Sequence, residues 1–105
     1  MSQFAVYENR DAATKETYPY FLSVQNDLFD ELNSRVVIPF TTPGSIQHRD
    51  AKKLCPVIQI KGDDFVLLTH QITTVPKSFL SSKTAVADAF RTEIISAIDF
   101  LFTGI

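Results

Sequence analysis

Residues 56–69 read Pro-Val-Ile-Gln-Ile-Lys-Gly-Asp-Asp-Phe-Val-Leu-Leu-Thr, and this stretch decides the fold class. Two apolar runs, 56–60 and 65–69, flank the short polar linker 61–64, which contains Gly62. Short apolar runs joined by a glycine-containing linker are typical of two antiparallel strands in a hairpin. The sequence therefore predicts an antiparallel sheet with a hairpin at this point.

Two further strands are predicted near the N-terminus. Residues 4–7 and 18–25 are rich in aromatic and β-branched side chains. Pro19 stands near the start of the second run, where a missing N–H is tolerated. The polar residues 8–17 between the two runs have little apolar surface to bury. We therefore expect a strand, an exposed loop and a second strand.

The middle of the chain adds an interior strand. Residues 35–40, Arg-Val-Val-Ile-Pro-Phe, form a short apolar run stopped by Pro39, as in a strand buried on both faces. Residues 41–53 follow neither a period of 2 nor one of 3.6, which predicts a loop with a short irregular strand. Residues 71–75 add one more strand.

The apolar pattern changes near the C-terminus to the period of a helix. One face carries Phe90, Ile94, Ala97, Ile98 and Leu101. We expect a helix with Asp88 as its N-cap, running to about Phe102 and ending at Gly104. A second apolar row, Ile95 and Phe102, indicates either a surface for a partner or a deeply buried helix.

These elements predict one domain over residues 1–105. The fold class that we expect is mostly β with a C-terminal α-helix, in which an antiparallel sheet curls into a partly open barrel closed by the helix.

Composition excludes several classes of function. The chain of 105 residues is 45% hydrophobic and 21% charged, as in an ordinary globular domain, and its formal net charge is −2. A negative chain is not expected to bind nucleic acid directly. No apolar run approaches the roughly 20 residues that span a bilayer, so no membrane association is expected. Residues 1–4 do not resemble the start of a secretory signal, which predicts a cytoplasmic location.

Residues that could carry catalysis are sparse. His48 and His70 stand in no metal-ligand spacing, and Cys55 is the single cysteine, so we expect neither a metal site nor a disulfide. Phosphate-binding glycine motifs are absent, so no cofactor is expected. His48, Arg49 and Asp50 lie close together in the chain, and a ribonuclease site assembled from such scattered residues remains open.

A series of short motifs runs in order along the chain. They are Gln3-Phe4-x-Val6-Tyr7, Val24-Gln25-x-Asp27, Val37-Ile38-Pro39, Pro56-Val57, Val75-Pro76-x-Ser78, Ala97-Ile98 and Phe102-x-Gly104-Ile105. Their order and spacing resemble the CcdB family, the toxins of plasmid-type toxin–antitoxin pairs. The resemblance spans nearly the whole chain.

The resemblance implies an SH3-like, partly open barrel of the type shared with the MazF ribonucleases, without nuclease activity. It implies a homodimer that binds the DNA gyrase A subunit and traps gyrase on cleaved DNA. It also implies a CcdA-like antitoxin that neutralises the toxin, autoregulates transcription with it and serves plasmid maintenance. The chain is thus expected not to be an enzyme.

The resemblance also implies site residues. The gyrase contacts would be Leu28, Phe29, Asp99, Phe102, Thr103, Gly104 and Ile105. Thr103 stands where the family's best-known member carries Trp, and Asp99 stands where the family has an amide. Arg10, in the first loop, would contact the antitoxin. Without the resemblance, Leu28 and Phe29 would be interpreted as a lid over the core.

Two alternatives remain beside the gyrase-binding toxin. One is a ribonuclease on the same fold, for which His48, Arg49 and Asp50 are the candidates. The other is a toxin-fold protein that has lost its target, which the substitution at Thr103 suggests.

Overall fold

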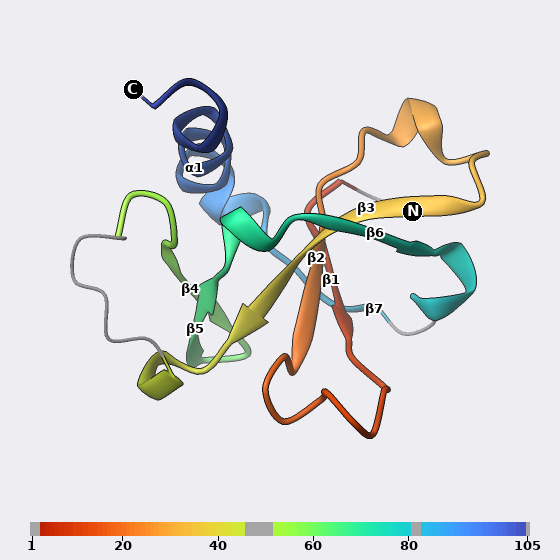
Figure 1. Ribbon diagram of the computed structural model, residues 1–105, viewed down its shortest axis with the longest axis horizontal. Helices are drawn as coiled ribbons and strands as arrows, with labels where there is room; N and C mark the ends of the chain where they lie inside the picture. The colour runs from red at the N-terminus through yellow and green to blue at the C-terminus, as the bar shows by residue number, and fades with distance from the viewer. Residues whose placement is uncertain (1–2, 46–51, 81–82, 105) are drawn as a thin grey trace.

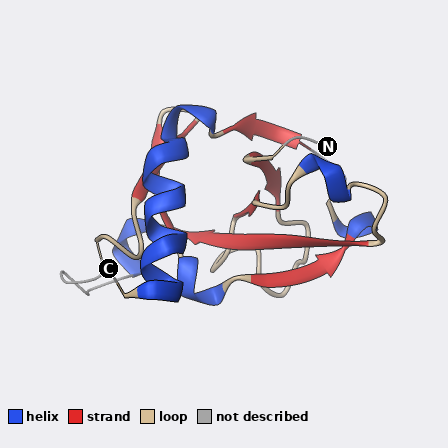
Figure 2. Ribbon diagram, turned by 90° about the horizontal axis from the view of Figure 1, so that it is seen from above, coloured by secondary structure: helices blue, strands red, loops and turns tan. Residues whose placement is uncertain are grey.

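The chain folds into one curled antiparallel sheet with a helix across one end (Figures 1 and 2). The computed structural model describes residues 3–45, 52–80 and 83–104. Within these ranges the strands are β1 Ala5–Glu8, β2 Tyr20–Ser23, β3 Ser34–Thr41, β4 Val57–Ile60, β5 Asp63–Leu67, β6 Thr73–Pro76 and β7 Lys83–Val86, and the helix is α1 Arg91–Thr103. The predicted fold class, mostly β with a C-terminal helix and a partly open barrel, is confirmed.

Strand β3 organises the sheet because it pairs with different neighbours along its length. The strand order is β4-β5-β3-β2-β1-β7, and β6 pairs with the first half of β3. Residues 34–37 of β3 face β6, whereas Phe40 and Thr41 face β5. Pro39 falls where one neighbour gives way to the other, a position that needs no N–H for a ladder. The strand therefore continues through Pro39 to Thr41 and does not stop there.

The predicted hairpin is formed by β4 and β5. The register pairs Ile60 with Asp63, so the turn consists of Lys61 and Gly62 alone. Both turn residues have positive φ, 54° and 87°, as a tight type I′ turn requires. The turn is thus shorter than the polar linker 61–64, and Asp63 and Asp64 belong to β5.

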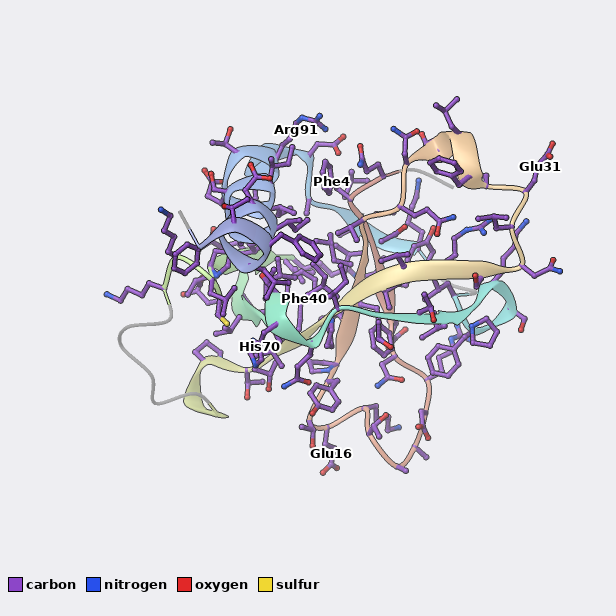
Figure 3. All side chains as sticks on the ribbon, turned by 45° about the horizontal axis from the view of Figure 1, so that its top comes forward. Phe4, Glu16, Glu31, Phe40, His70 and Arg91 are labelled. Carbon is purple, nitrogen blue, oxygen red and sulfur yellow. The ribbon has the colours of Figure 1, made fainter. Side chains whose placement is uncertain are left out.

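Both faces of the central strands are buried, as the apolar run in β3 predicts. Ile38 and Phe40 lie in the cluster that packs against Ile94 of α1. Val37 faces the opposite side, in a cluster with Leu80 from the segment after β6. Figure 3 shows Phe40 in the interior, near α1. The sheet is therefore covered by the helix on one face and by its own later segment on the other.

The helix begins later than the sequence predicts. Asp88 opens a 3-10 turn, Asp88–Phe90, and α1 starts at Arg91 without a side-chain cap, so the prediction of Asp88 as N-cap is wrong. The C-terminal stop at Gly104 is confirmed, because Gly104 has φ 73° and its N–H donates to Phe100 O at 2.9 Å.

One strand was not predicted, and one expectation falls largely outside the described residues. Strand β7 was missed, because Lys83-Thr84-Ala85-Val86 is half polar and pairs only with the distant β1. Thr41 ends β3 and Pro43–Ser45 form a 3-10 turn, whereas residues 46–51, the centre of the range in which we expected an irregular strand, lie outside the described residues.

Candidate functional site

The loop between β2 and β3 presents an apolar surface to solvent. We call Leu28, Phe29 and Leu32 the apolar knob; their side chains are 84%, 53% and 52% exposed. The interpretation of Leu28 and Phe29 as a lid over the core is therefore wrong. Leu32 was not predicted as a site residue, although it stands three residues after Phe29 and four after Leu28, a spacing that would place all three side chains on one face of a helical turn.

Short hydrogen-bonded turns give this loop a defined shape. Asn26 caps the 3-10 turn Asp27–Phe29, because its side-chain Oδ1 accepts from the Leu28 N–H at 2.9 Å. The Gln25 side chain donates to Phe29 O at 2.9 Å and accepts from the Val36 N–H at 3.1 Å. Gln25 thus ties the apolar knob to the first residues of β3.

A buried arginine holds the rest of the loop. Arg35 is fully buried, and its guanidinium donates to the carbonyl oxygens of Asp30, Leu32 and Ser34. The Arg35 guanidinium thus supplies hydrogen-bond donors to the loop's carbonyl oxygens, while the Leu32 side chain stays exposed. Sequence reasoning placed Arg35 in an apolar run and gave it no role.

Tyr7 of β1 has a raised pKa, to which groups of this loop contribute. Burial raises the pKa of the Tyr7 hydroxyl; the carboxylates of Asp30 and Asp27 raise it further, whereas the Arg35 guanidinium lowers it. The carboxylates of the loop and the guanidinium of Arg35 therefore have opposite effects on the pKa of the same tyrosine.

The second predicted contact surface is the C-terminal end of α1. Phe102, Thr103, Gly104 and Asp99 are all exposed there, and Ile105 lies outside the described residues. The Thr103 hydroxyl donates to Asp99 O at 2.7 Å, one turn back along the helix. An exposed phenylalanine beside small and polar residues gives this end a surface suited to contact with another protein.

The structure does not bring the two predicted contact surfaces together in one copy. In Figures 1 and 2, α1 and the turn Asp27–Phe29 lie toward opposite ends of the longest axis, along which the molecule extends 37 Å. A partner that touches both surfaces of one copy must therefore extend along much of this axis.

The loop that carries Arg10 is well ordered. The buried Asn9 side chain donates to Tyr18 O at 2.8 Å and to the Thr14 hydroxyl at 3.0 Å. Its Oδ1 accepts from the Asp11 N–H, so that Arg10 lies exposed between two fixed residues. The sequence predicted the exposed loop but not the asparagine that organises it.

The side chains that could carry catalysis are few within the described ranges, and others belong to residues outside them. His48, Arg49 and Asp50, the ribonuclease candidates, lie outside the described residues. Cys55 is buried with its Sγ 3.5 Å from His70 Nδ1; burial raises the pKa of the thiol, and the Thr69 backbone N–H lowers it. Within residues 3–45, 52–80 and 83–104, no three His, Cys, Asp or Glu side chains gather as metal ligands do.

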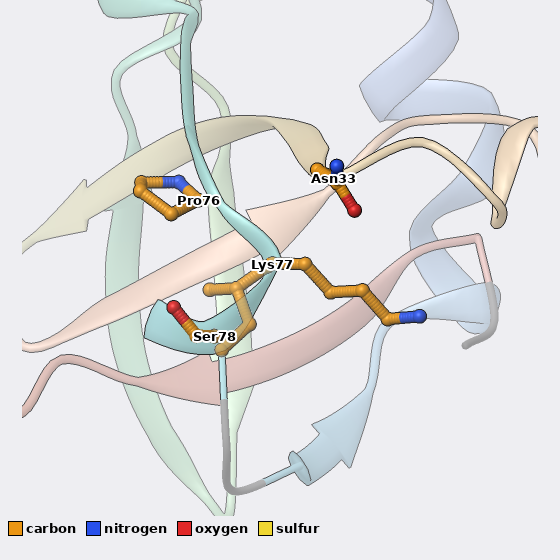
Figure 4. A pocket seen from close by; sticks show the side chains of 5 residues that line it. Asn33, Pro76, Lys77 and Ser78 are labelled. Carbon is orange, nitrogen blue, oxygen red and sulfur yellow. The ribbon is translucent and has the colours of Figure 1, made fainter.

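A shallow hollow of about 630 Å³ adjoins the loop (Figure 4). Its lining comes from the end of the loop and from the segment after β6: Asn33, Pro76, Lys77, Ser78 and Leu80. The Lys77 N–H donates to Asn33 O at 2.7 Å, which fixes the two sides together. Lys77 is the charged member of this lining, so the hollow offers no acid–base pair.

Comparison with known proteins identifies the fold and the family of this chain. A solved structure described as an endoribonuclease in complex with its cognate antitoxin, from a mycobacterial species, has the same fold with a TM-score of 0.74. The two chains are 17% identical, and the match covers 96% of this chain and 93% of the other. The chain thus has the fold of an endoribonuclease that binds an antitoxin. Residues 3–104 match the family described as CcdB protein, and the chain belongs to the CcdB family.

No helix within the described ranges has both the length and the apolar character needed to cross a membrane.

Proposed function

We propose that this chain is a cytoplasmic toxin that binds the DNA gyrase A subunit and traps the complex of gyrase with cleaved DNA. The observation that carries the proposal is family membership over residues 3–104. It is supported by the exposure of apolar side chains at both places where the family resemblance puts gyrase contacts, Leu28 with Phe29 and Phe102. In this mechanism gyrase cuts the DNA, and the toxin acts by stabilising one state of gyrase.

A homodimer follows from the same proposal. Ile95, on the outer face of α1, is partly exposed, and Phe102 is largely exposed on the next turns of the helix. Pairing of two helices through such a row would bury this apolar surface and bring two C-terminal ends close to one two-fold axis. The gyrase contact made by Thr103, Gly104 and Ile105 would then be doubled.

We also propose a CcdA-like antitoxin as partner. Support comes from family membership and from the fold neighbour, which was solved with its cognate antitoxin. Arg10 is an exposed residue of the loop held by Asn9, and arginine is a side chain suited to bidentate contact with carboxylates. Antitoxin binding would release gyrase, regulate transcription of the pair and serve plasmid maintenance.

The direct test is DNA cleavage by purified gyrase. Gyrase, ATP and supercoiled plasmid are incubated with the chain, and linear DNA is measured after denaturant and protease treatment. We expect linear DNA to rise with toxin concentration, and to rise much less with the variant Phe102→Ser. Phe102 is largely exposed, so this variant should remain folded. Absence of linear DNA at a large excess of folded toxin would refute gyrase poisoning.

A ribonuclease is the second candidate, favoured by the TM-score of 0.74 with an endoribonuclease. The chain is incubated with long single-stranded RNA beside a triple variant of His48, Arg49 and Asp50 to Ala. Cleavage by the parent chain but not by the variant would establish this function. If RNA stays intact and gyrase is also unaffected, the third candidate remains, a toxin fold that has lost its target through changes such as Thr103.

A further inference from the structure

The fold brings Cys55 and His70 together although they are 15 residues apart in the chain. Cys55 stands just before β4, and His70 lies in the 3-10 turn Thr69–Gln71 that follows β5. The two strands are antiparallel, so the residues that precede one lie beside the residues that follow the other. Cys55 Sγ is thereby placed 3.5 Å from His70 Nδ1. No local spacing in the sequence indicates this pair.

The distance between the sulfur and the ring nitrogen suits a single bound metal ion. In tetrahedral zinc sites the metal lies about 2.3 Å from a thiolate sulfur and about 2.0–2.1 Å from an imidazole nitrogen, which places these two ligand atoms roughly 3.6 Å apart. Cys55 Sγ and His70 Nδ1 need almost no movement to reach this separation. An ion could therefore bind between them without rearrangement of the backbone.

One member of the pair is buried and the other reaches solvent. Cys55 is 6% exposed and packs with Val66 and Leu68, whereas His70 is exposed. An ion could enter from the side of His70 and keep water on its remaining positions, as ions in open zinc sites do. A thiolate with an imidazole favours zinc, cobalt or copper over magnesium and calcium, which prefer oxygen ligands.

The Thr69 side chain gives a second indication of a ligand beside Cys55. The backbone N–H of Thr69 bonds the Cys55 sulfur, so Thr69 is in direct contact with the thiol. Its side chain is fully buried, and within the described residues its hydroxyl has no hydrogen-bond partner. Native proteins leave few buried polar atoms without a partner, and such an atom calls for an explanation such as a bound water or ion. A water held by the ion would give the Thr69 hydroxyl a partner.

We propose that Cys55 and His70 form a binding site for one zinc-class ion in each chain. The ion takes the thiolate sulfur and Nδ1 as its protein ligands, and water fills the other positions, so the site is open and not a closed structural one. On binding, the bond from sulfur to the metal replaces the S–H bond, the thiol proton passes to solvent, and no electron is transferred. The site does not depend on the proposed function, because neither residue belongs to the surfaces assigned to gyrase or the antitoxin.

A bound ion would link two segments that both contact α1. The 3-10 turn Thr69–Gln71 packs against the helix, below it in Figure 1. Lys53, two residues before Cys55, places its Nζ 5.0 Å from the centroid of the Phe100 ring on the same helix. We therefore expect the ion to stabilise the folded chain, because it binds a pair that unfolding separates.

The first experiment titrates the full chain, without a histidine tag, with Co²⁺ as a coloured substitute for Zn²⁺. We expect near-ultraviolet absorption from a thiolate–cobalt bond that saturates at one ion per chain and disappears when Zn²⁺ displaces the cobalt. His70→Gln should weaken Co²⁺ binding by more than the roughly 10–100-fold typical of losing a group that only orients a ligand. The control Gln71→Ala, in the same turn, should bind Co²⁺ as the parent chain does.

The second experiment measures thermal unfolding with Zn²⁺ and again after addition of a chelator. At an ion concentration about tenfold above Kd, the Tm of the parent chain should rise by up to about 10 °C and return after chelation. Gln71→Ala should show the same rise, whereas Cys55→Ser and His70→Gln should show none. His70 is exposed, so His70→Gln should remain folded even if Cys55→Ser does not.

Each outcome decides the proposal. Saturation at one Co²⁺ per chain that requires both Cys55 and His70 establishes the site. If the parent chain shows no thiolate–cobalt absorption at a large excess of Co²⁺, the proposal is overturned. It is also overturned if His70→Gln binds Co²⁺ as tightly as the parent chain, since His70 is then not a ligand. Absence of saturation, or saturation at one ion for two chains, would exclude a site formed within one chain.

Discussion

Replacing Ile94 with alanine, beside the same change at Ile95, tests the packing of α1 most directly. Ile94 is 0% exposed and lies in the main core cluster, whereas its neighbour Ile95 is 36% exposed on the outer face. Both substitutions remove the same atoms from the same helix, and both gain the same few tenths of a kcal/mol from alanine's helix propensity. Their difference therefore reports burial alone.

The expected magnitudes follow from the structure. Removing about three buried methyl or methylene groups at Ile94 costs roughly 2.4 kcal/mol in transfer free energy, at about 0.8 kcal/mol for each group. The cavity that remains adds to this cost, so Ile94→Ala should lower the free energy of unfolding by about 2–5 kcal/mol. Ile95→Ala, at a partly hydrated site, should cost about 1 kcal/mol or less.

The assay is urea denaturation followed by circular dichroism, at a low and a high protein concentration. An equal loss for the two variants at low concentration would show that α1 does not pack through the Ile94 face, and the reasoning would be refuted. If two copies pair through α1, the cost of Ile95→Ala should grow with protein concentration, because dimerisation then adds to stability.

Three further predictions concern the C-terminus and Cys55. Deleting Gly104 and Ile105 should abolish growth inhibition and leave thermal unfolding nearly unchanged, because Gly104 is exposed beyond the last helical turn; continued killing by the truncated chain would show that the assigned site is wrong. Thr103→Trp should tighten gyrase binding about twofold to thirtyfold by restoring a ring able to stack on a cation, and unchanged affinity would exclude such a contact. Burial raises the pKa of the Cys55 thiol, so its contribution to stability should be present below the ordinary thiol pKa and be lost as pH rises through the raised value. A Cys55→Ala variant should lose less stability than the parent chain over that alkaline range, and identical pH profiles would contradict the assignment.

The elements with strong local patterns were predictable from the sequence. The hairpin of β4 and β5 followed from two apolar runs around Gly62, and the period of 3.6 located α1. Strand β7 was not predictable, because it is short, partly polar and stabilised only by pairing with β1 from the other end of the chain. Its identity depends on tertiary contacts that no local window contains.

The candidate site was also predictable from the sequence only in part. The positions of Leu28 and Phe29 followed from the family resemblance, but their exposure did not, because apolar residues in a loop are compatible with a lid as well as with a contact surface. What decides between the two is Arg35, whose long side chain satisfies the loop carbonyls from inside. Nothing in a sequence distinguishes an arginine that holds a loop from one that is solvated at a strand end.

The separation of the two contact surfaces has a consequence for how gyrase would be bound. If two copies pair through α1, the symmetry places both helix ends at the centre and one apolar knob on each flank. A symmetric target would then meet the toxin at three places, and each knob substitution would act twice. For independent flanks the free-energy losses add, so a fivefold loss at one knob becomes about twenty-five-fold for the paired assembly. Leu28→Thr should therefore weaken binding far more in a dimer than in a mixed dimer that retains one intact knob. Equal affinities of the two assemblies would show that only one knob, or neither, reaches the target.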